Sequence, residues 1–73
     1  MDPARVVKRE LALQIERSMR REGLSKPRMA RRMRTSRSQL DRVLDPRCTG
    51  VQLGTLVRAA QAVGRSLEIR IAG

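Results

Sequence analysis

The chain contains no phenylalanine, tyrosine or tryptophan, so its core must be built from aliphatic side chains and methionine alone. Aromatic rings bury more apolar surface than these side chains, and 73 residues lie near the lower size limit for a domain with one core. The sequence therefore predicts a single domain over residues 1–73 with a thin core. We expect association with a second copy to stabilise it.

Apolar residues at helical spacing predict a long first helix over about residues 3–22. Asp2 and Pro3 are typical of a helix start, and Gly23 suits the left-handed residue that ends a helix. Apolar residues spaced by four predict its buried face: Val7, Leu11, Ile15 and Met19. Val6 and Leu13 lie off this face, which suggests a second contact surface.

Three further helices follow at shorter intervals. Ser25 is an N-cap for a helix that begins at residue 26, and Ser36 caps another over 37–44, which ends before Pro46. A fourth helix over about 53–63 is closed by Gly64. The expected core residues are Leu11, Ile15, Met19, Met29, Met33, Leu40, Val43, Leu53, Leu56 and Val63.

Residues 66–71 alternate between apolar and charged side chains, which is the period of a strand. A lone strand leaves its backbone groups unpaired, and no other segment can pair with it. The simplest partner is the same strand of a second copy, paired antiparallel across a two-fold axis. The expected fold class is mainly α: four helices and one C-terminal β-strand that pairs across a homodimer. The expected interface residues are Leu67, Ile69 and Ile71.

The charge of the chain restricts its partners. Seventeen Lys and Arg stand against seven Asp and Glu, a net charge of +10 that favours a polyanion. No apolar run is long enough to cross a membrane, and no aromatic residue is present to sit at its surface, so we expect no membrane partner. Without a signal-peptide pattern, a soluble cytoplasmic protein is expected. Single-strand and RNA-binding modules usually stack bases on aromatic rings, so duplex DNA is favoured.

Histidine is absent and Cys48 is the single cysteine, so we expect no cofactor, no soft-ligand metal site and no internal disulfide. Cys48 is interpreted as a passive loop residue. An enzyme is the least expected class, because no nucleophile–base pair and no clustered carboxylates occur. Five basic residues outside the central segment are expected to be solvated: Arg5, Lys8, Arg9, Arg58 and Arg65.

A short helix that begins at about residue 26 and the helix over 37–44 form a candidate helix-turn-helix over about residues 26–44. Ala30 is small where the two helices approach each other, and only a three- or four-residue turn separates them. Any small helical bundle can show such a pattern, but here positive charge is also concentrated in the segment over residues 26–47. This segment holds two acidic residues, Asp41 and Asp45, and eight basic residues: Lys26, Arg28, Arg31, Arg32, Arg34, Arg37, Arg42 and Arg47.

Residues 24–44, followed by 53–64, resemble the Xre/Cro-type helix-turn-helix family of phage repressors, bacterial regulators and antitoxins. The resemblance covers roughly two-thirds of the chain and implies a four-helix Cro/repressor-like domain. Four residues match the family pattern: Ala30, Ser36, Leu40 and Val43. Thr35 stands where an aliphatic residue is common. Arg34 stands where the family usually has glycine, which implies either a left-handed residue or a longer turn.

In this family the start of the second helix of the motif points at base edges in the major groove. The resemblance therefore implies four base-reading residues: Arg37, Ser38, Gln39 and Arg42. Arginine suits guanine and glutamine suits adenine. Phosphate contact at helix N-termini is expected for Lys26, Arg28, Thr35 and Ser36. Four residues are either phosphate neighbours or solvated charge: Arg31, Arg32, Arg34 and Arg47. Asp41 is expected to orient an arginine or to face solvent.

The leading hypothesis is a homodimeric, sequence-specific double-stranded DNA-binding regulator of the repressor type. The fourth helix followed by the strand is similar to HigA-type and HicB-type antitoxins, which implies dimerisation and autoregulation. An antitoxin that binds and neutralises a toxin protein is therefore the alternative, and a neighbouring toxin gene would favour it. A nucleoid-associated protein without sequence preference is a third hypothesis, because arginine is spread along much of the chain.

Overall fold

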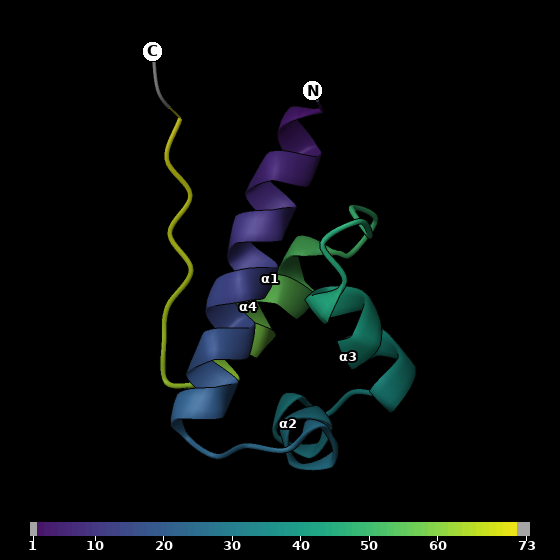
Figure 1. Cartoon of the computed structure of the whole chain (residues 1–73), viewed down its shortest axis with the longest axis vertical. Coiled ribbons are helices and arrows are strands. Elements are labelled where there is room, and N and C mark those ends of the chain that lie inside the picture. Colours follow the sequence, from purple (N-terminus) through teal and green to yellow (C-terminus); the bar gives the residue numbers. More distant parts are fainter. Residues whose placement is uncertain (1, 72–73) are drawn as a thin grey trace.

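The computed structural model describes residues 2–71, which form a mainly helical domain measuring 37 × 21 × 19 Å (Figure 1). The described part of the chain holds four helices: α1 (Pro3–Arg21), α2 (Lys26–Met33), α3 (Arg37–Leu44) and α4 (Leu53–Ala62). All four helices predicted from the sequence are present. The bounds of α1, α3 and α4 lie within one residue of the prediction, and α2 begins at the predicted residue 26.

The capping signals explain these bounds. The Asp2 side chain accepts a hydrogen bond from the backbone N–H of Ala4 at 3.0 Å, which satisfies a free donor at the start of α1. Gly23, with φ +63°, ends α1, and Gly64, with φ +72°, ends α4. After α1, the N–H of Leu24 donates to the carbonyl of Met19 at 2.8 Å, so the last turn of the helix is closed by a Schellman motif.

The centre of the core comes from α2 and α3, which pack against each other and against α4, while α3 also packs against α1. The largest fully buried side chains all belong to these two helices: Met29, Met33, Leu40 and Val43. Small residues of α1, α2 and α4 let the helices approach closely, namely Ala12, Ala30, Ala59 and Ala60. The α2–α3 pair therefore supplies the largest fully buried side chains of the core.

Most of the predicted core is confirmed. Ile15, Met19 and Val63 are buried together with the four central side chains, and Leu11 and Leu56 are half-buried against them. The prediction for Leu53 was wrong: it begins α4 and is 55% exposed. The prediction that Val7 belongs to the buried face of α1 was also wrong, because Val7 is 67% exposed. With 19 residues, α1 is more than twice as long as α3, the eight-residue helix that it packs against, so its N-terminal turns extend beyond the core.

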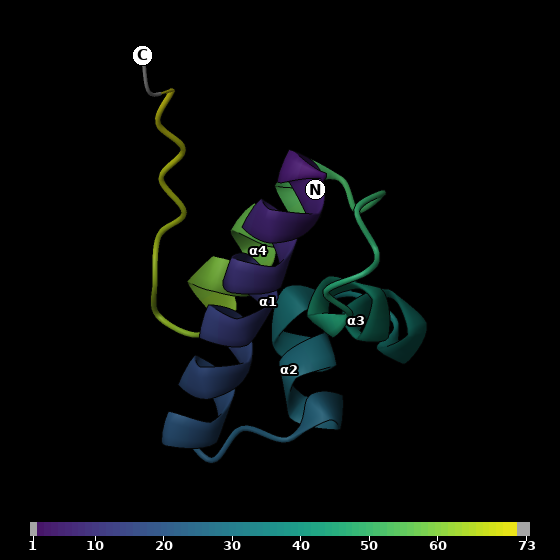
Figure 2. The same cartoon turned by 45° about the horizontal axis from the view of Figure 1, so that its top comes forward.

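The chain after α4 runs in an extended conformation alongside α1, towards the N-terminal end of that helix (Figures 1 and 2). Residues 65–71 are called the tail below. No residue from 2 to 71 is assigned to a strand, so the predicted strand is not formed by one chain alone. A strand needs a partner for its backbone groups, and its pairing across a homodimer stays a prediction.

Within residues 2–71, no helix combines the length and the apolar composition that are needed to span a lipid bilayer.

Candidate nucleic-acid interface

The start of α2 is open to solvent and basic. Ser25 caps the helix, and its Oγ accepts a hydrogen bond from the backbone N–H of Arg28 at 3.4 Å. Lys26 and Arg28 lie in this first turn and are exposed. The free N–H groups and the positive end of the helix dipole favour an anion at such a place. Two predicted phosphate contacts are thus brought together at one helix end.

The turn between α2 and α3 is held by Arg34 in the left-handed conformation, with φ 55° and ψ 48°. Its N–H donates to the carbonyl of Arg31 at 3.1 Å, and the N–H of Thr35 donates to the carbonyl of Ala30 at 3.0 Å. These two bonds make the same Schellman motif that Gly23 closes after α1. Of the two alternatives for Arg34, a left-handed residue and a longer turn, the first is therefore confirmed.

Burial of two residues of α3 decides which side chains face outward. Leu40 and Val43 are completely buried, so the opposite side of the helix meets solvent. Arg37, Ser38 and Arg42 are exposed there, whereas Gln39 is half-buried. The Oγ of Ser36 accepts a hydrogen bond from the N–H of Gln39 at 3.1 Å and caps the helix. The four predicted base-reading residues thus share one surface, with Gln39 at its margin.

An ion pair joins the start of α2 to the outward side of α3. The Nζ of Lys26 lies 3.4 Å from Oδ1 of Asp41, and both side chains are about half exposed. Asp41 thus contacts a lysine and not an arginine. Exposed pairs of this kind are weak, contributing about 0–1 kcal/mol, so a phosphate can replace the carboxylate as the partner of Lys26.

The other predicted phosphate contacts fall into two groups. Arg31 and Arg34 are exposed at the end of α2, and Thr35 and Ser36 lie in the turn. Arg32 is directed elsewhere: its Nη1 donates to the carbonyl of Ala62 at 3.1 Å and so caps the last turn of α4.

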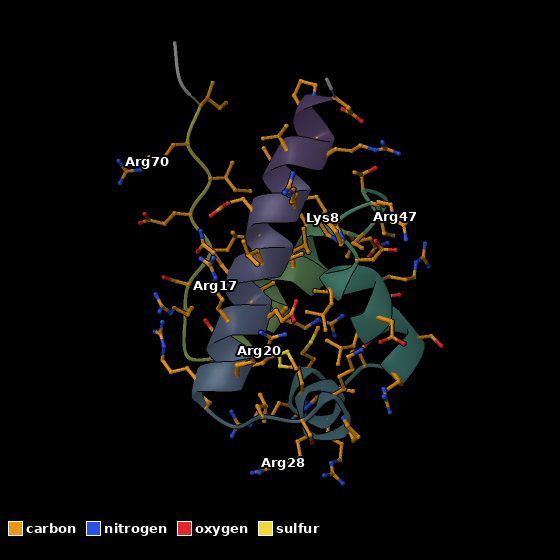
Figure 3. The ribbon with its side chains drawn as sticks, in the orientation of Figure 1. Lys8, Arg17, Arg20, Arg28, Arg47 and Arg70 are labelled. Carbon is orange, nitrogen blue, oxygen red and sulfur yellow. The ribbon has the colours of Figure 1, made fainter. Side chains whose placement is uncertain are left out.

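Arg47 lies beyond the end of α3, where its backbone N–H donates to Oδ1 of Asp45 at 2.9 Å. Figure 3 shows that Arg28 and Arg47 belong to the side of the molecule formed by α2 and α3, whereas Arg17 and Arg70 lie on the side of α1 and the tail. Basic residues thus lie both at the start of α2 and beyond the end of α3.

Lys8 is the residue that sequence reasoning missed. It was expected to be solvated, but it is only 5% exposed, and its Nζ donates to the carbonyls of Arg42 at 3.0 Å and Asp45 at 2.8 Å. The last carbonyls of a helix have no partner within the helix, and they favour a cation. Lys8, which extends from α1 (Figure 3), therefore fixes the C-terminal end of α3 to α1.

The sequence carries a signal for this role. Lys8 continues the spacing of the residues that α1 buries, Ala12, Ile15 and Met19, one turn towards the N-terminus. Burial lowers the pKa of Lys8 from its ordinary value of 10.5, because the charged form loses water, while the charges of Cys48 and Asp45 act in the opposite direction.

Comparison of this chain with protein families, with curated proteins and with solved structures gave no match. A functional assignment therefore depends on the arrangement of its own residues.

Proposed function

We propose that this protein is a homodimeric, sequence-specific double-stranded DNA-binding regulator that inserts α3 into the major groove. The observation that carries the proposal is the arrangement of α3. Its buried residues fix the helix in the core, while Arg37, Ser38 and Arg42 face solvent from its outward side. Lys8 holds its far end against α1.

The dimensions of α3 suit this role. With its side chains an α-helix is about 10–12 Å in diameter, and the major groove is about 12 Å wide, so α3, with eight residues, fits into the groove. Arginine binds the O6 and N7 acceptors of guanine with two hydrogen bonds, and each such pair contributes about 1–3 kcal/mol of discrimination. Arg37 and Arg42 are the two arginines of this helix, and both are exposed.

Phosphate contacts supply the affinity in this proposal. Lys26 at the start of α2 lies beside the outward side of α3, since it contacts Asp41, and Arg28 is exposed in the same first turn of α2. A DNA strand that passes the start of α2 meets free N–H groups as well as these cations. Binding should then weaken as salt is added, because each neutralised phosphate releases counterions.

A homodimer places two copies of α3 on one face of the duplex. Dimeric helix-turn-helix proteins read half-sites about one helical turn, or 34–36 Å, apart. With this role the protein acts at the nucleoid, where occupation of a promoter represses transcription.

Selection of bound sequences from random duplex DNA at physiological salt tests the proposal. The expected result is an inverted repeat with half-sites about one helical turn apart. Recovery of unrelated sequences would instead indicate the non-specific, nucleoid-coating alternative, and absence of duplex binding would overturn both.

Three variants then separate the roles of the residues. Arg37→Ala should abolish the preference for the selected site over random duplex. Lys26→Ala should weaken binding to both and reduce the slope of binding against salt by about one. Arg58→Ala, at an exposed position of α4, is the control and should leave the preference unchanged. Equal losses of preference for Arg37→Ala and Lys26→Ala would contradict the assignment.

A further inference from the structure

The apolar residues of the tail become more exposed towards its end. Leu67 is half-buried, Ile69 is 66% exposed and Ile71 is 99% exposed. Side chains of an extended segment alternate between its two sides, so these three residues share one side, while Glu68 and Arg70 share the other. The apolar side of the tail is therefore covered by its own chain only at Leu67.

The part of α1 that faces the tail also has exposed apolar side chains. Val6 and Val7 are 48% and 67% exposed. Together with Leu11 and Leu67 they line a groove of about 500 Å³ between α1 and the tail, whose other lining residues are Glu10, Gln14, Ser66 and Glu68. Because the tail runs alongside α1 towards its N-terminal end (Figure 1), both exposed apolar sets belong to the same end of the molecule.

The order of residues in the tail is symmetric about Ile69. An apolar residue, a charged residue, Ile69, a charged residue and an apolar residue follow one another, and the two charges, Glu68 and Arg70, are opposite in sign. An antiparallel pair of identical segments centred on Ile69 places Glu68 opposite Arg70 of the partner, twice. It also places Leu67 opposite Ile71 on the apolar side. Opposite charges and apolar pairs at facing positions both stabilise a sheet.

Each neighbouring register of the antiparallel pair of tails is less stable than the one centred on Ile69. Centring the pair on Glu68 places two carboxylates opposite each other, and centring it on Arg70 places two guanidinium groups opposite each other; like charges at facing positions are destabilising. A register shifted so that odd and even residues face each other mixes charged side chains into the apolar side. Charge complementarity thus selects a second copy of the tail as the occupant, and one register for it.

We infer that the apolar surface formed by the tail and by Val6 and Val7 of α1 binds a second copy of this chain, with the two tails paired antiparallel about Ile69. This inference rests on the homodimer of the proposed function and adds its register and its helical part. A two-stranded ribbon alone is marginally stable in water, so it needs a helix to cover its apolar side. Val6 and Val7, in the exposed turns of α1, cover the apolar side of the ribbon.

Cysteine cross-linking tests the register directly. In a Cys48→Ser background, which removes the single native thiol, three variants each carry one cysteine: Glu68→Cys, Ile69→Cys and Arg70→Cys. Only position 69 faces its own copy across the two-fold axis, so mild oxidation should give a covalent dimer with Ile69→Cys and little with the other two. Preferential cross-linking at 68 or 70 would overturn the register.

Charge reversal tests the same pairing without cysteine. Glu68→Arg and Arg70→Glu should each weaken homodimerisation roughly tenfold, because each substitution creates two like-charged pairs. A mixture of the two variants should form heterodimers, and the double variant Glu68→Arg/Arg70→Glu should dimerise like the unmodified chain. Light scattering against concentration measures these changes, with Glu22→Arg, an exposed site outside the tail, as the control.

The helical part of the interface has its own test. Val7→Ser should weaken dimerisation without altering the fold of the monomer, since Val7 is exposed in one chain. If every tail and α1 variant remains dimeric, the interface lies elsewhere and the inference fails, whereas recovery of an inverted repeat from random DNA would leave the proposed function standing. If the chain dimerises through the tail but shows no preference for any DNA site, the inference stands and the proposed function fails.

Discussion

The α2–α3 pair and the tail use the same kind of aliphatic side chain in opposite ways. Leu40 and Val43 are completely buried within the chain, whereas Ile69 and Ile71 are exposed. The first pair of residues obtains its free energy of burial from the fold of one copy, and the second can obtain it only from another molecule. Changes in α3 should therefore act at any protein concentration, and changes in the tail only where copies associate.

The largest expected effect comes from Leu40→Ala. Removing this buried side chain leaves a cavity between helices and should lower the free energy of unfolding by about 2–5 kcal/mol. Ile71→Ala is the matched variant in the tail and should leave the monomer unchanged at high dilution. Urea denaturation at several concentrations measures both. An equal loss for Ile71→Ala in the dilute monomer would break the comparison.

Lys8→Met should have the next largest effect. Methionine retains an unbranched apolar stem but donates no hydrogen bond, so the carbonyls of Arg42 and Asp45 lose their partner. The free energy of unfolding should fall by about 1–3 kcal/mol. Arg9→Met, at an exposed position of the same helix, should change it by less than about 0.5 kcal/mol. Similar values for the two variants would show that Lys8 contributes no more than surface charge.

Arg34→Gly should be stabilising. A left-handed residue with a Cβ costs about 1–2 kcal/mol, and glycine avoids this cost but loses more backbone entropy on folding. A net gain of about 1 kcal/mol is expected, seen as a higher Tm. Arg34→Ala retains the Cβ and removes the same charge, so it should show no gain. If both variants gain equally, charge repulsion and not backbone strain limits the turn.

The smallest effect is a pH dependence. Burial lowers the pKa of Lys8 in the folded chain below the ordinary value of 10.5 that the unfolded chain retains. Between these two pKa values the unfolded chain holds more protons, so the free energy of unfolding of the unmodified chain relative to Lys8→Met should rise with pH. Urea denaturation of both chains in steps up to pH 10.5 measures the difference. A difference that falls with pH would contradict a desolvated Lys8.

The helices were predictable because their signals are local. Ser25 and Ser36 cap α2 and α3 through hydrogen bonds to residues three positions later, and Gly23 and Gly64 supply left-handed conformations. The outward side of α3 followed from helical spacing once Leu40 and Val43 were expected inside. Three features were not predictable in this way: the carbonyl partners of Lys8, the exposure of Leu53 and the contact of Arg32 with α4.

By itself, the sequence determined where the helices begin and end, which residues of α2 and α3 face inward, and that the tail alternates, because each of these depends on residues within a few positions of one another. Only the tertiary structure decided that Lys8 reaches the end of α3 and that Lys26 meets Asp41. It also decided that the tail runs beside exposed turns of α1. Such contacts join residues far apart in the chain, so they depend on how the helices pack.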